Sequence, residues 1–203
     1  MGSPMAKRTL DLLLALSGLV LLSPIFALVA LWIKVDSAGP ILFRQERVSR
    51  GGVSFRILKF RSMYPEAEDQ GRLTIGEDLR VTRAGRVLRR YKLDELPQLF
   101  NVVLGEMSLV GPRPEVKEYF ELYPPEAQRA MINLRPGMTD PSSFTLLKES
   151  EILGRSADAQ RTYRSELIPI KSRFIVEYAT HHSVRGDLWL ILCTLQKLFI
   201  RWR

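Results

Sequence analysis

The sequence predicts a mixed α/β (α+β) protein with a membrane segment near its N-terminus, and three observations support that class. An apolar segment near the N-terminus, residues 10–33, contains a single charged residue, Asp11. Two short runs of alternating residues follow it, and most of the remaining chain has helical periodicity. The 203 residues, 46% of them hydrophobic, are enough for one globular domain with a core of its own.

Ser23 and Pro24 lie near the middle of the apolar segment and decide how it could enter a membrane. A helix over the segment would run roughly 36 Å against a hydrocarbon core of roughly 30 Å, so its length permits a full crossing. Proline removes a helical hydrogen bond and predicts a bend or break, and the serine hydroxyl can pair with the carbonyl that is freed. Basic residues flank both ends, which favours both ends on the cytoplasmic face. The residues alone leave open a re-entrant helix-break-helix hairpin over residues 5–36 and a kinked transmembrane helix.

The rest of the chain, residues 37–203, is predicted to begin with a short β-hairpin and to continue with helices. Residues 1–4 look like a cloning remnant and carry no information about the fold. Strands over residues 41–45 and 53–60 flank a glycine pair, Gly51-Gly52, which is typical of a hairpin. Helical patterns predict helices over residues 83–90 with Thr82 as the cap, 94–104 and 125–134, a mainly helical stretch over 157–182 that Pro169 interrupts, and a last helix over about 187–203.

The last predicted helix is amphipathic. Leu188, Leu192 and Leu195 fall on one face, while Lys197 lies elsewhere and Trp189 suits the depth of lipid headgroups. We expect an interfacial helix on the membrane surface. An ordinary helix that closes the core has the same pattern and stays the alternative.

The chain has a formal net charge of +8, which points to an anionic partner: nucleic acid, an acidic membrane surface or a phosphorylated substrate. No nucleic-acid-binding module is recognisable in the sequence, so we expect no nucleic-acid partner. Cys193 is the only cysteine, which excludes an intrachain disulfide. Cys193, His181 and His182 have no partner ligands at metal-binding spacing and are given no role.

Two adjacent carboxylates, Asp94 and Glu95, and an arginine between two prolines, Arg113, are the strongest candidates for a functional site. A carboxylate pair can bind a divalent metal ion or supply a nucleophile, and an arginine fork can hold a phosphate. Acidic residues are also common in the first turn of a helix, where they cap free N–H groups. The basic residues upstream and Arg113 downstream favour phosphoryl chemistry over capping.

At these residues the chain resembles the monotopic phosphoglycosyl transferases, the bacterial sugar transferase family. Each motif is weak alone, but their order and spacing through most of the chain are specific. The motifs are Lys7-Arg8 with the apolar segment, Lys59-Phe-Arg-Ser-Met63, Leu93-Asp-Glu-Leu-Pro-Gln-Leu-Phe-Asn101, Met107-Ser-Leu-Val-Gly-Pro-Arg-Pro114 and Arg135-Pro-Gly-Met-Thr139.

The resemblance implies transfer of a sugar-1-phosphate from a UDP-sugar to undecaprenyl phosphate, with release of UMP, in the first membrane step of bacterial glycoconjugate synthesis. It implies a re-entrant hairpin broken at Ser23 and Pro24, a catalytic domain on the cytoplasmic side of the inner membrane, and contact with phospholipids. A homodimer is compatible with it, and the donor sugar is not fixed.

The resemblance also implies ping-pong chemistry with Mg²⁺, for which Mn²⁺ could substitute. Asp94 would be the nucleophile, and Asp94 and Glu95 would hold the metal ion. The side chains that would bind the substrate phosphates are Lys59, Arg61, Arg113 and Arg135.

Two other functions stay open: a basic membrane-anchored scaffold in which Asp94 and Glu95 cap a helix, and a membrane phosphohydrolase that uses the same aspartate. The chain departs from the family pattern after Thr139, where Asp140-Pro-Ser-Ser-Phe-Thr-Leu-Leu-Lys148 replaces a segment that begins Gly-Trp-Ala-Gln. We hypothesise that this loop contacts the sugar. A tolerated change in a surface loop is the alternative.

Overall fold

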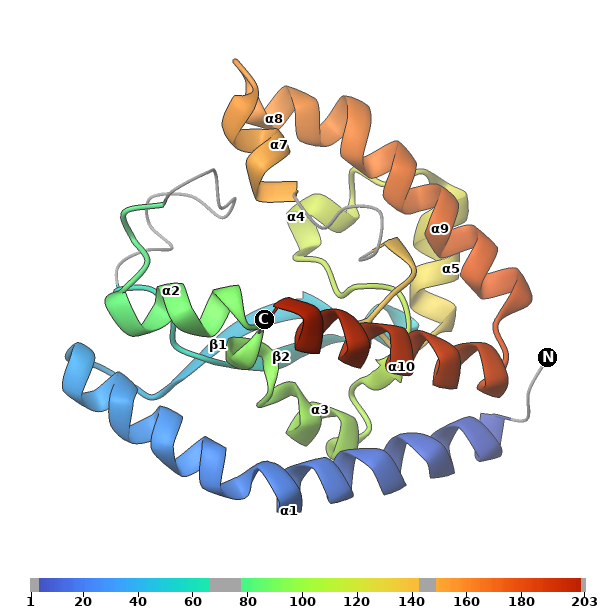
Figure 1. Ribbon diagram of the computed structural model, residues 1–203. Helices are drawn as coiled ribbons and strands as arrows, with labels where there is room; N and C mark the ends of the chain where they lie inside the picture. The colour runs from blue at the N-terminus through green and yellow to red at the C-terminus, as the bar shows by residue number, and fades with distance from the viewer. Residues whose placement is uncertain (1–3, 66–77, 143–148, 202–203) are drawn as a thin grey trace.

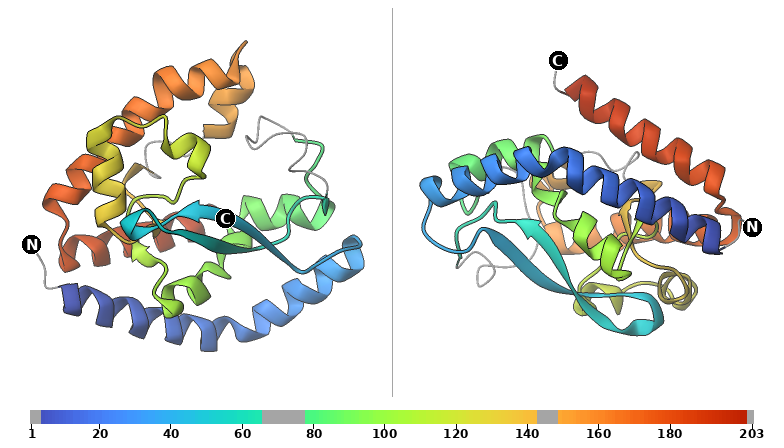
Figure 2. Two further views of the ribbon diagram at one scale, coloured as in Figure 1. Left: turned by 180° about the vertical axis from the view of Figure 1, so that it is seen from behind. Right: turned by 90° about the horizontal axis from the view of Figure 1, so that it is seen from below.

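The computed structural model describes residues 4–65, 78–142 and 149–201, and it confirms a mixed architecture of helices and short strands. The long helix α1 (Pro4–Asp36) runs along one side of a body that the other elements form (Figure 1). The helix α10 (Val184–Arg201) starts beside the N-terminal end of α1 and diverges from it (Figure 2).

The N-terminal apolar segment forms one continuous helix, so the predicted break at Ser23 and Pro24 is corrected. Pro24 has no N–H to offer the carbonyl of Val20, and the Ser23 hydroxyl donates to that carbonyl at 2.8 Å instead. The serine therefore fills the hydrogen bond that the proline removes, as the sequence suggested it could. The helix stays intact and curves around the body (Figure 1).

Charged side chains near the N-terminal end tie α1 to the body. Asp11 is 3% exposed, and its carboxylate accepts hydrogen bonds from the Ser108 hydroxyl at 2.8 Å and the Leu109 N–H at 3.0 Å. The Lys7 ammonium pairs with the carboxylate of Asp187, in α10, at 2.6 Å. Lys7, which the sequence placed among the charges flanking a membrane segment, therefore anchors α1 to the rest of the protein.

Arg61 holds the C-terminal end of α1. Its guanidinium is buried and donates to the backbone carbonyls of Ile33 at 3.3 Å, Ser37 at 2.6 Å and Ala38 at 2.5 Å. A helix leaves its last carbonyls unpaired, and a cation is favourable there. Gly39 closes the loop around Arg61 with a φ of 122°, and a Cβ at this position would collide with the guanidinium.

The outer face of α1 is apolar and exposed. Its length and composition would allow it to cross a membrane, and only 11% of its most apolar 18-residue window is buried. The core helix of a soluble protein would be mostly buried, so this exposure favours contact with lipid. The exposed apolar side chains include Leu13, Leu16, Val20, Leu21, Leu28, Leu31 and Val35.

The predicted antiparallel hairpin is confirmed as β1 (Leu42–Val48) and β2 (Ser54–Phe60). Its tip is a short 3-10 turn, η1 (Arg50–Gly52), in which Gly51 and Gly52 have φ values of 76° and 75°. Positive φ is favourable for glycine, which explains why the glycine pair marks the turn.

The acidic pair lies in a tight turn rather than in an α-helix. The helix predicted over residues 94–104 is divided into a 3-10 turn, η3 (Leu93–Glu95), and the helix α3 (Gln98–Leu104). The proline between them suits the start of a helix, so the α-helix begins after the acidic pair. The preceding helix α2 (Arg83–Arg90) is capped as predicted, because the Thr82 hydroxyl accepts a first-turn N–H at 2.9 Å.

A parallel pair of strands, β3 (Ser108–Val110) and β4 (Gly137–Thr139), was not predicted. Three-residue strands are too short for an alternating pattern to be visible. Gly111 and Gly137 lie where the two backbones meet, and a Cβ on either would collide with backbone atoms. The pair brings the Pro-Arg-Pro motif beside the Arg-Pro-Gly motif.

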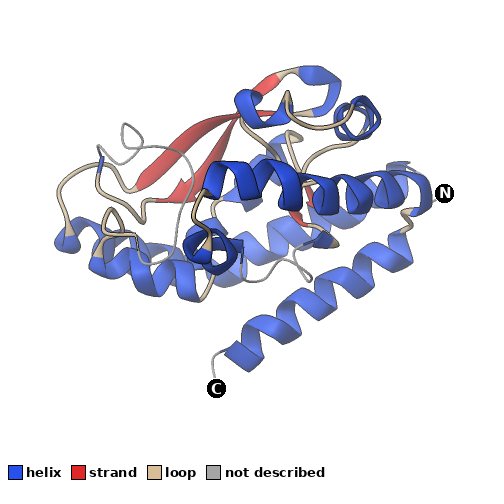
Figure 3. Cartoon of the chain, turned by 90° about the horizontal axis from the view of Figure 1, so that it is seen from above, coloured by secondary structure: helices blue, strands red, loops and turns tan. Residues whose placement is uncertain are grey.

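Most of the body is helical, as Figure 3 shows. Pro169 lies in the first turn of α9 (Ile168–His181), and the predicted interruption takes the form of a π-helical turn, η4 (Tyr163–Leu167), just before it. The other helices within the described ranges are α4 (Lys117–Phe120), α5 (Pro125–Asn133), α7 (Glu149–Arg155) and α8 (Ala159–Thr162).

The last helix, α10, has one face on the core and another in the open. Leu190 and Ile191 pack against buried residues of the body. The residues left exposed on α10 include Leu188, Trp189, Leu192 and Leu195. The three leucines of the predicted apolar face therefore lie on the exposed side of α10, and a different apolar pair packs on the body.

We predict that Gly39→Ala destabilises the protein more than Gly52→Ala. Both glycines have positive φ, and a side chain in such a conformation costs about 1–3 kcal/mol. Only at Gly39 would the added Cβ also collide with Arg61; among the described residues nothing lies within 4 Å of a Cβ at Gly52. Denaturant titration of both variants measures the difference. Equal losses would show that Arg61 does not need the tight loop.

Candidate active site

Glu95 joins two of the predicted phosphate-binding residues at one carboxylate oxygen. Its Oε1 accepts hydrogen bonds from the Lys59 ammonium at 3.1 Å and from Arg113 Nη2 at 2.9 Å. Lys59 comes from β2, Glu95 from η3 and Arg113 from the loop after β3, so the three meet only in the folded chain. Burial alone would raise the pKa of Glu95, but Lys59 and Arg113 hold it well below its ordinary value. The Glu95 carboxylate therefore stays charged.

Lys59 and Arg113 differ in the direction of their pKa shifts and in the exposure of their side chains. Burial lowers the pKa of Lys59 against the opposing influence of Glu95, and its side chain is 17% exposed. Glu95 raises the pKa of Arg113, whose side chain is 38% exposed. An exposed guanidinium fork that uses one nitrogen for a carboxylate can bind a phosphate oxygen with the others.

Asp94 lies next to this cluster and is nearly buried, with 8% of its surface exposed. Its Oδ1 is buried and has no hydrogen-bond partner among the residues that the structure describes. Burial, and then the charge of Glu95, raises the pKa of Asp94. A buried carboxylate oxygen without a donor is costly, and such costs are typical of functional sites. Asp94 is therefore the candidate nucleophile or metal ligand.

Neither acidic side chain caps a helix. Lys92 precedes η3 in a left-handed conformation, with a φ of 57°, and Pro97 precedes α3; neither terminus has a side-chain cap. The contacts described for Glu95 are with side chains of the body, not with N–H groups of a helix. The capping explanation that the sequence left open does not account for the pair.

Asn101 fixes the distance between β2 and α3, and sequence reasoning gave it no role. It is 1% exposed, and its Oδ1 accepts the Leu58 N–H at 2.9 Å while its Nδ2 donates to the Arg56 carbonyl at 2.9 Å. The side chain thus bonds to β2 as a neighbouring strand would, directly beside Lys59. An amide followed directly by the apolar residues of a predicted helix was the signal that could have identified it.

Another buried carboxylate, that of Glu115, supports the loop that carries Arg113. It is 5% exposed, and its Oε1 accepts hydrogen bonds from two tyrosine hydroxyls at 3.1 and 3.3 Å. Arg47 lies 3.7 Å from its Oε2 and donates to the carbonyl of Pro114 at 3.0 Å. Because Pro114 adjoins Arg113, these contacts hold the arginine loop against β1.

Of the four predicted phosphate-binding residues, Arg61 and Arg135 are not brought to Glu95 in the structure. Arg61 is bound to the end of α1, as described above. Arg135 Nε donates to the carbonyl of Gly105 at 3.0 Å. Gly105 follows the C-terminal end of α3, whereas Asp94 precedes the N-terminal end. Both arginines therefore hold the ends of helices.

The departure from the family pattern after Thr139 begins close to Arg113. Asp140 is 5% exposed, and its charge contributes to the raised pKa of Arg113. Its Oδ1 accepts the N–H of Ser142 at 2.7 Å. Residues 143–148, the rest of the loop, lie outside the described residues. The start of the loop is thus within electrostatic reach of the site.

Asp94 and Glu95 suit a metal ion that substrate phosphates also bind. Mg²⁺ is commonly held by one or two carboxylates together with phosphates and water. Asp94 offers the Oδ1 that no described residue contacts, whereas Glu95 Oε1 is already shared by two cations. Within the described ranges no third acidic, histidine or cysteine side chain joins them, so ligands from a substrate would have to complete the coordination.

Comparison with known proteins agrees with the resemblance that the motifs suggest. Residues 2–201 match the family model described as bacterial sugar transferase. The chain is 46% identical over 197 residues to the UDP-glucose:undecaprenyl-phosphate glucose-1-phosphate transferase of Caulobacter vibrioides, which covers 95% of the chain and 69% of that protein. It is 37% identical over 187 residues to the UDP-N-acetylgalactosamine-undecaprenyl-phosphate N-acetylgalactosaminephosphotransferase of Aeromonas hydrophila, with coverages of 91% and 40%.

A third relative is the exopolysaccharide production protein ExoY of Sinorhizobium fredii. The two are 41% identical over 150 residues, and the match covers 66% of each chain. The chain therefore spans between 40% and 69% of the length of these three relatives. The names of the first two agree on undecaprenyl phosphate and differ in the sugar, glucose in one and N-acetylgalactosamine in the other.

We predict that Asn101→Ala lowers the free energy of unfolding by about 2 kcal/mol, because it leaves the Leu58 N–H and the Arg56 carbonyl without their partner. Asn133→Ala, at an exposed asparagine of α5, is the matched control and should change it by less than about 0.5 kcal/mol. Denaturant titration measures both variants. A loss at Asn101 no larger than at Asn133 would contradict the bridging role.

Proposed function

Because the chain belongs to the bacterial sugar transferase family, we propose that it transfers a sugar-1-phosphate from a UDP-sugar to undecaprenyl phosphate. The products would be undecaprenyl-diphospho-sugar and UMP, formed at the cytoplasmic face of the bacterial inner membrane during exopolysaccharide or related glycan synthesis. The observation that carries the proposal is the buried Asp94, with an Oδ1 that no described residue contacts, beside a Glu95 that holds Lys59 and Arg113.

In the first half-reaction an oxygen of the Asp94 carboxylate attacks the phosphorus that carries the sugar. The bond from that phosphorus to the oxygen shared with UMP breaks, and UMP leaves with the electron pair. A carboxylate is a weak nucleophile toward an anionic diphosphate, so positive charge must surround the phosphates, and Lys59 and Arg113 supply it. A bound Mg²⁺, or Mn²⁺ in its place, would neutralise further charge on the phosphates, with Asp94 and Glu95 as its protein ligands.

In the second half-reaction an oxygen of undecaprenyl phosphate attacks the same phosphorus, and the Asp94 carboxylate leaves. Because the phosphoryl group is held covalently between the two steps, a water-soluble donor and a lipid acceptor can use one site in turn. The burial of Asp94 restricts the access of water, which would otherwise hydrolyse the acyl phosphate.

The two other functions fit these observations less well. A scaffold does not need a buried carboxylate oxygen without a donor, and the acidic pair does not cap a helix. A phosphohydrolase would need water at Asp94, which is 8% exposed. The names of the first two relatives described above also favour a transferase.

We propose that α1 dips into the membrane with both of its ends at the cytoplasmic face. Both ends are attached to the same body, since Lys7 pairs with Asp187 near one end and Arg61 binds carbonyls at the other. A crossing helix would place these attachments on opposite sides of a hydrocarbon layer roughly 30 Å thick. The curved course of α1 along the body (Figure 1) and the exposed apolar side chains of α10 support a shallow insertion.

We predict that Asp94→Asn lowers UMP release at least about a thousandfold, because an amide cannot form the acyl phosphate. The assay uses the full chain in nanodiscs with Mg²⁺, undecaprenyl phosphate and a panel of UDP-sugars, whose best member would identify the donor. Glu177→Gln, at an exposed carboxylate of α9, is the matched control and should keep wild-type turnover. Persistent release from Asp94→Asn would reject the covalent mechanism. Release of free sugar phosphate without the lipid would instead indicate a phosphohydrolase.

We predict that Ala6→Cys and Ala38→Cys, each in a Cys193→Ser background, react from the same side of the membrane. Both alanines are exposed: Ala6 lies in the first turn of α1, and Ala38 lies just after its C-terminal end. A membrane-impermeant maleimide should label both variants in inverted inner-membrane vesicles. It should label neither in cells whose outer membrane is permeabilised and whose inner membrane is intact. Labelling of the two from opposite sides would show a transmembrane helix and reject the shallow insertion.

A further inference from the structure

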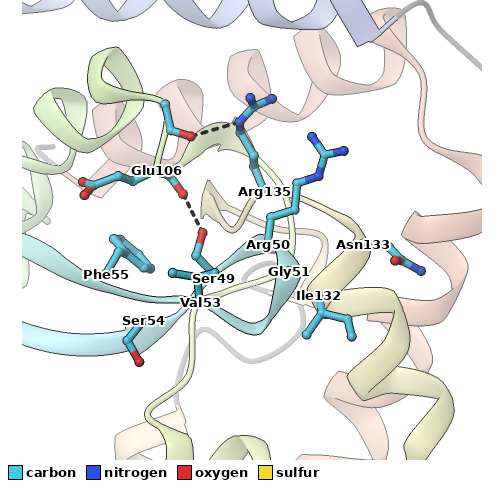
Figure 4. A pocket seen from close by; sticks show the side chains of 11 residues that line it. Ser49, Arg50, Gly51, Val53, Ser54, Phe55, Glu106, Ile132, Asn133 and Arg135 are labelled. Atoms are coloured by element: carbon cyan, nitrogen blue, oxygen red, sulfur yellow. Dashed lines mark hydrogen bonds between the residues drawn. The ribbon is translucent and has the colours of Figure 1, made fainter.

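Arg50 and Arg135 line a cavity that does not include the Glu95 cluster. The cavity has a volume of about 580 Å³ and lies between the hairpin tip, the turn after α3 and the end of α5. Small-molecule sites commonly have volumes of about 300–1,000 Å³. The guanidinium groups of the two arginines point to the same side (Figure 4).

Arg8 and Arg135 both bind the C-terminal end of α3, next to this cavity. Arg8 donates to the carbonyls of Val102 at 2.7 Å and Val103 at 3.1 Å, and Arg135 Nε donates to the carbonyl of Gly105 at 3.0 Å. A Cβ at Gly105 would lie 3.5 Å from the Arg8 guanidinium, so the two arginines flank the same turn. A helix C-terminus carries roughly half an elementary negative charge, which balances only part of the positive charge of the two arginines.

The acidic groups near the cavity do not balance the remaining positive charge. Burial lowers the pKa of Arg135, and Arg8 and Arg50 lower it further, with Asp11 acting in the opposite sense. The Asp11 carboxylate is committed to two hydrogen bonds with β3. The Glu106 carboxylate accepts a hydrogen bond from a buried amide at 2.7 Å and points away from the two guanidinium groups in Figure 4. An anion in the cavity would relieve the repulsion among the arginines.

Both arginines that line this cavity have hydrogen-bond donors available. Arg135 is fixed through its Nε, and within the described ranges no hydrogen bond engages its Nη atoms. The side chain of Arg50 likewise has no described partner, and the hairpin tip that carries it is fixed by the Ser49 hydroxyl, which donates to the Glu106 carbonyl at 3.0 Å. Arginine forks match the geometry of phosphate oxygens and can bind them through two parallel, charge-assisted hydrogen bonds.

We propose that this cavity binds a phosphate group between Arg50 and Arg135, as an anion site separate from Asp94. The ligand is a phosphate monoester or diester, supplied by the headgroup of an anionic phospholipid or by a soluble phosphate compound. A phosphate bound here joins the hairpin tip to the end of α3 and, through Arg8, lies next to the N-terminal part of α1. The site does not depend on the transferase activity proposed above.

The test uses the full chain, labelled with ¹⁵N in its arginines, in nanodiscs of zwitterionic lipid. Inorganic phosphate and a water-soluble short-chain phosphatidic acid are titrated separately, and the Nε–H signal of Arg135, assigned by its loss in Arg135→Lys, is followed by NMR. Phosphate binding shifts this signal in the wild type. Arg50→Gln should raise the midpoint at least about tenfold, the loss expected for one charge-assisted hydrogen bond.

Arg56→Gln removes an exposed arginine from the same hairpin and is the matched control, which should leave the midpoint unchanged. Similar midpoints for the two probes would identify a soluble phosphate as a sufficient ligand, and a much lower midpoint for the lipid would identify the headgroup. The proposal is overturned if neither probe shifts the Arg135 signal, or if Arg50→Gln binds as the wild type does.

Discussion

The attachment of α1 to the body through buried charged groups is the constraint on which the rest of the structure depends. Asp11 binds β3 near one end of the helix, and Arg61 binds the carbonyls at the other. Both side chains are buried, and removing the partner of a buried charge costs about 3–5 kcal/mol. The helix therefore cannot swing away from the body without a large loss. Its apolar outer face and the Glu95 cluster keep a fixed relation to each other, which is what a site for a lipid substrate requires.

The helix α3 transmits this constraint from α1 to the site. Gly18 lets α1 approach closely, since a Cβ there would lie 3.3 Å from the Leu99 side chain. Two residues further along α3, Asn101 bonds to the backbone of β2, and β2 carries Lys59 to Glu95. The helices α1 and α3 and the hairpin thus form a continuous chain of contacts. The ion pairs of the site rest on that chain and not on local sequence alone.

The sequence predicted the elements that have strong local signals. It did not predict the elements whose structure depends on contacts between residues distant in the chain. A glycine pair marked the hairpin turn, but the β3–β4 pair depends on two backbones meeting. Pro24 indicated a break, yet the Ser23 hydroxyl and the contacts of α1 with the body keep the helix whole. The resemblance grouped Lys59 and Arg61 as phosphate-binding residues, whereas β2 ends at Phe60 and the chain turns Arg61 toward α1. Motif spacing therefore found Asp94, Glu95, Lys59 and Arg113 but could not give the directions of Arg61 and Arg135.

Two adjacent carboxylates with opposite environments suggest how one site could serve two phosphate substrates. Glu95 has its pKa lowered by Lys59 and Arg113 and stays charged, while burial and Glu95 raise the pKa of Asp94. Asp94 Oδ1 has no hydrogen bond with a described residue, so no such bond has to break before this oxygen attacks phosphorus. A diphosphate carries more negative charge than one carboxylate, so it competes with Glu95 for the same two cations. The lipid phosphate would meet the same cations after UMP has left, which is why a single cluster suffices for both half-reactions of the proposed mechanism.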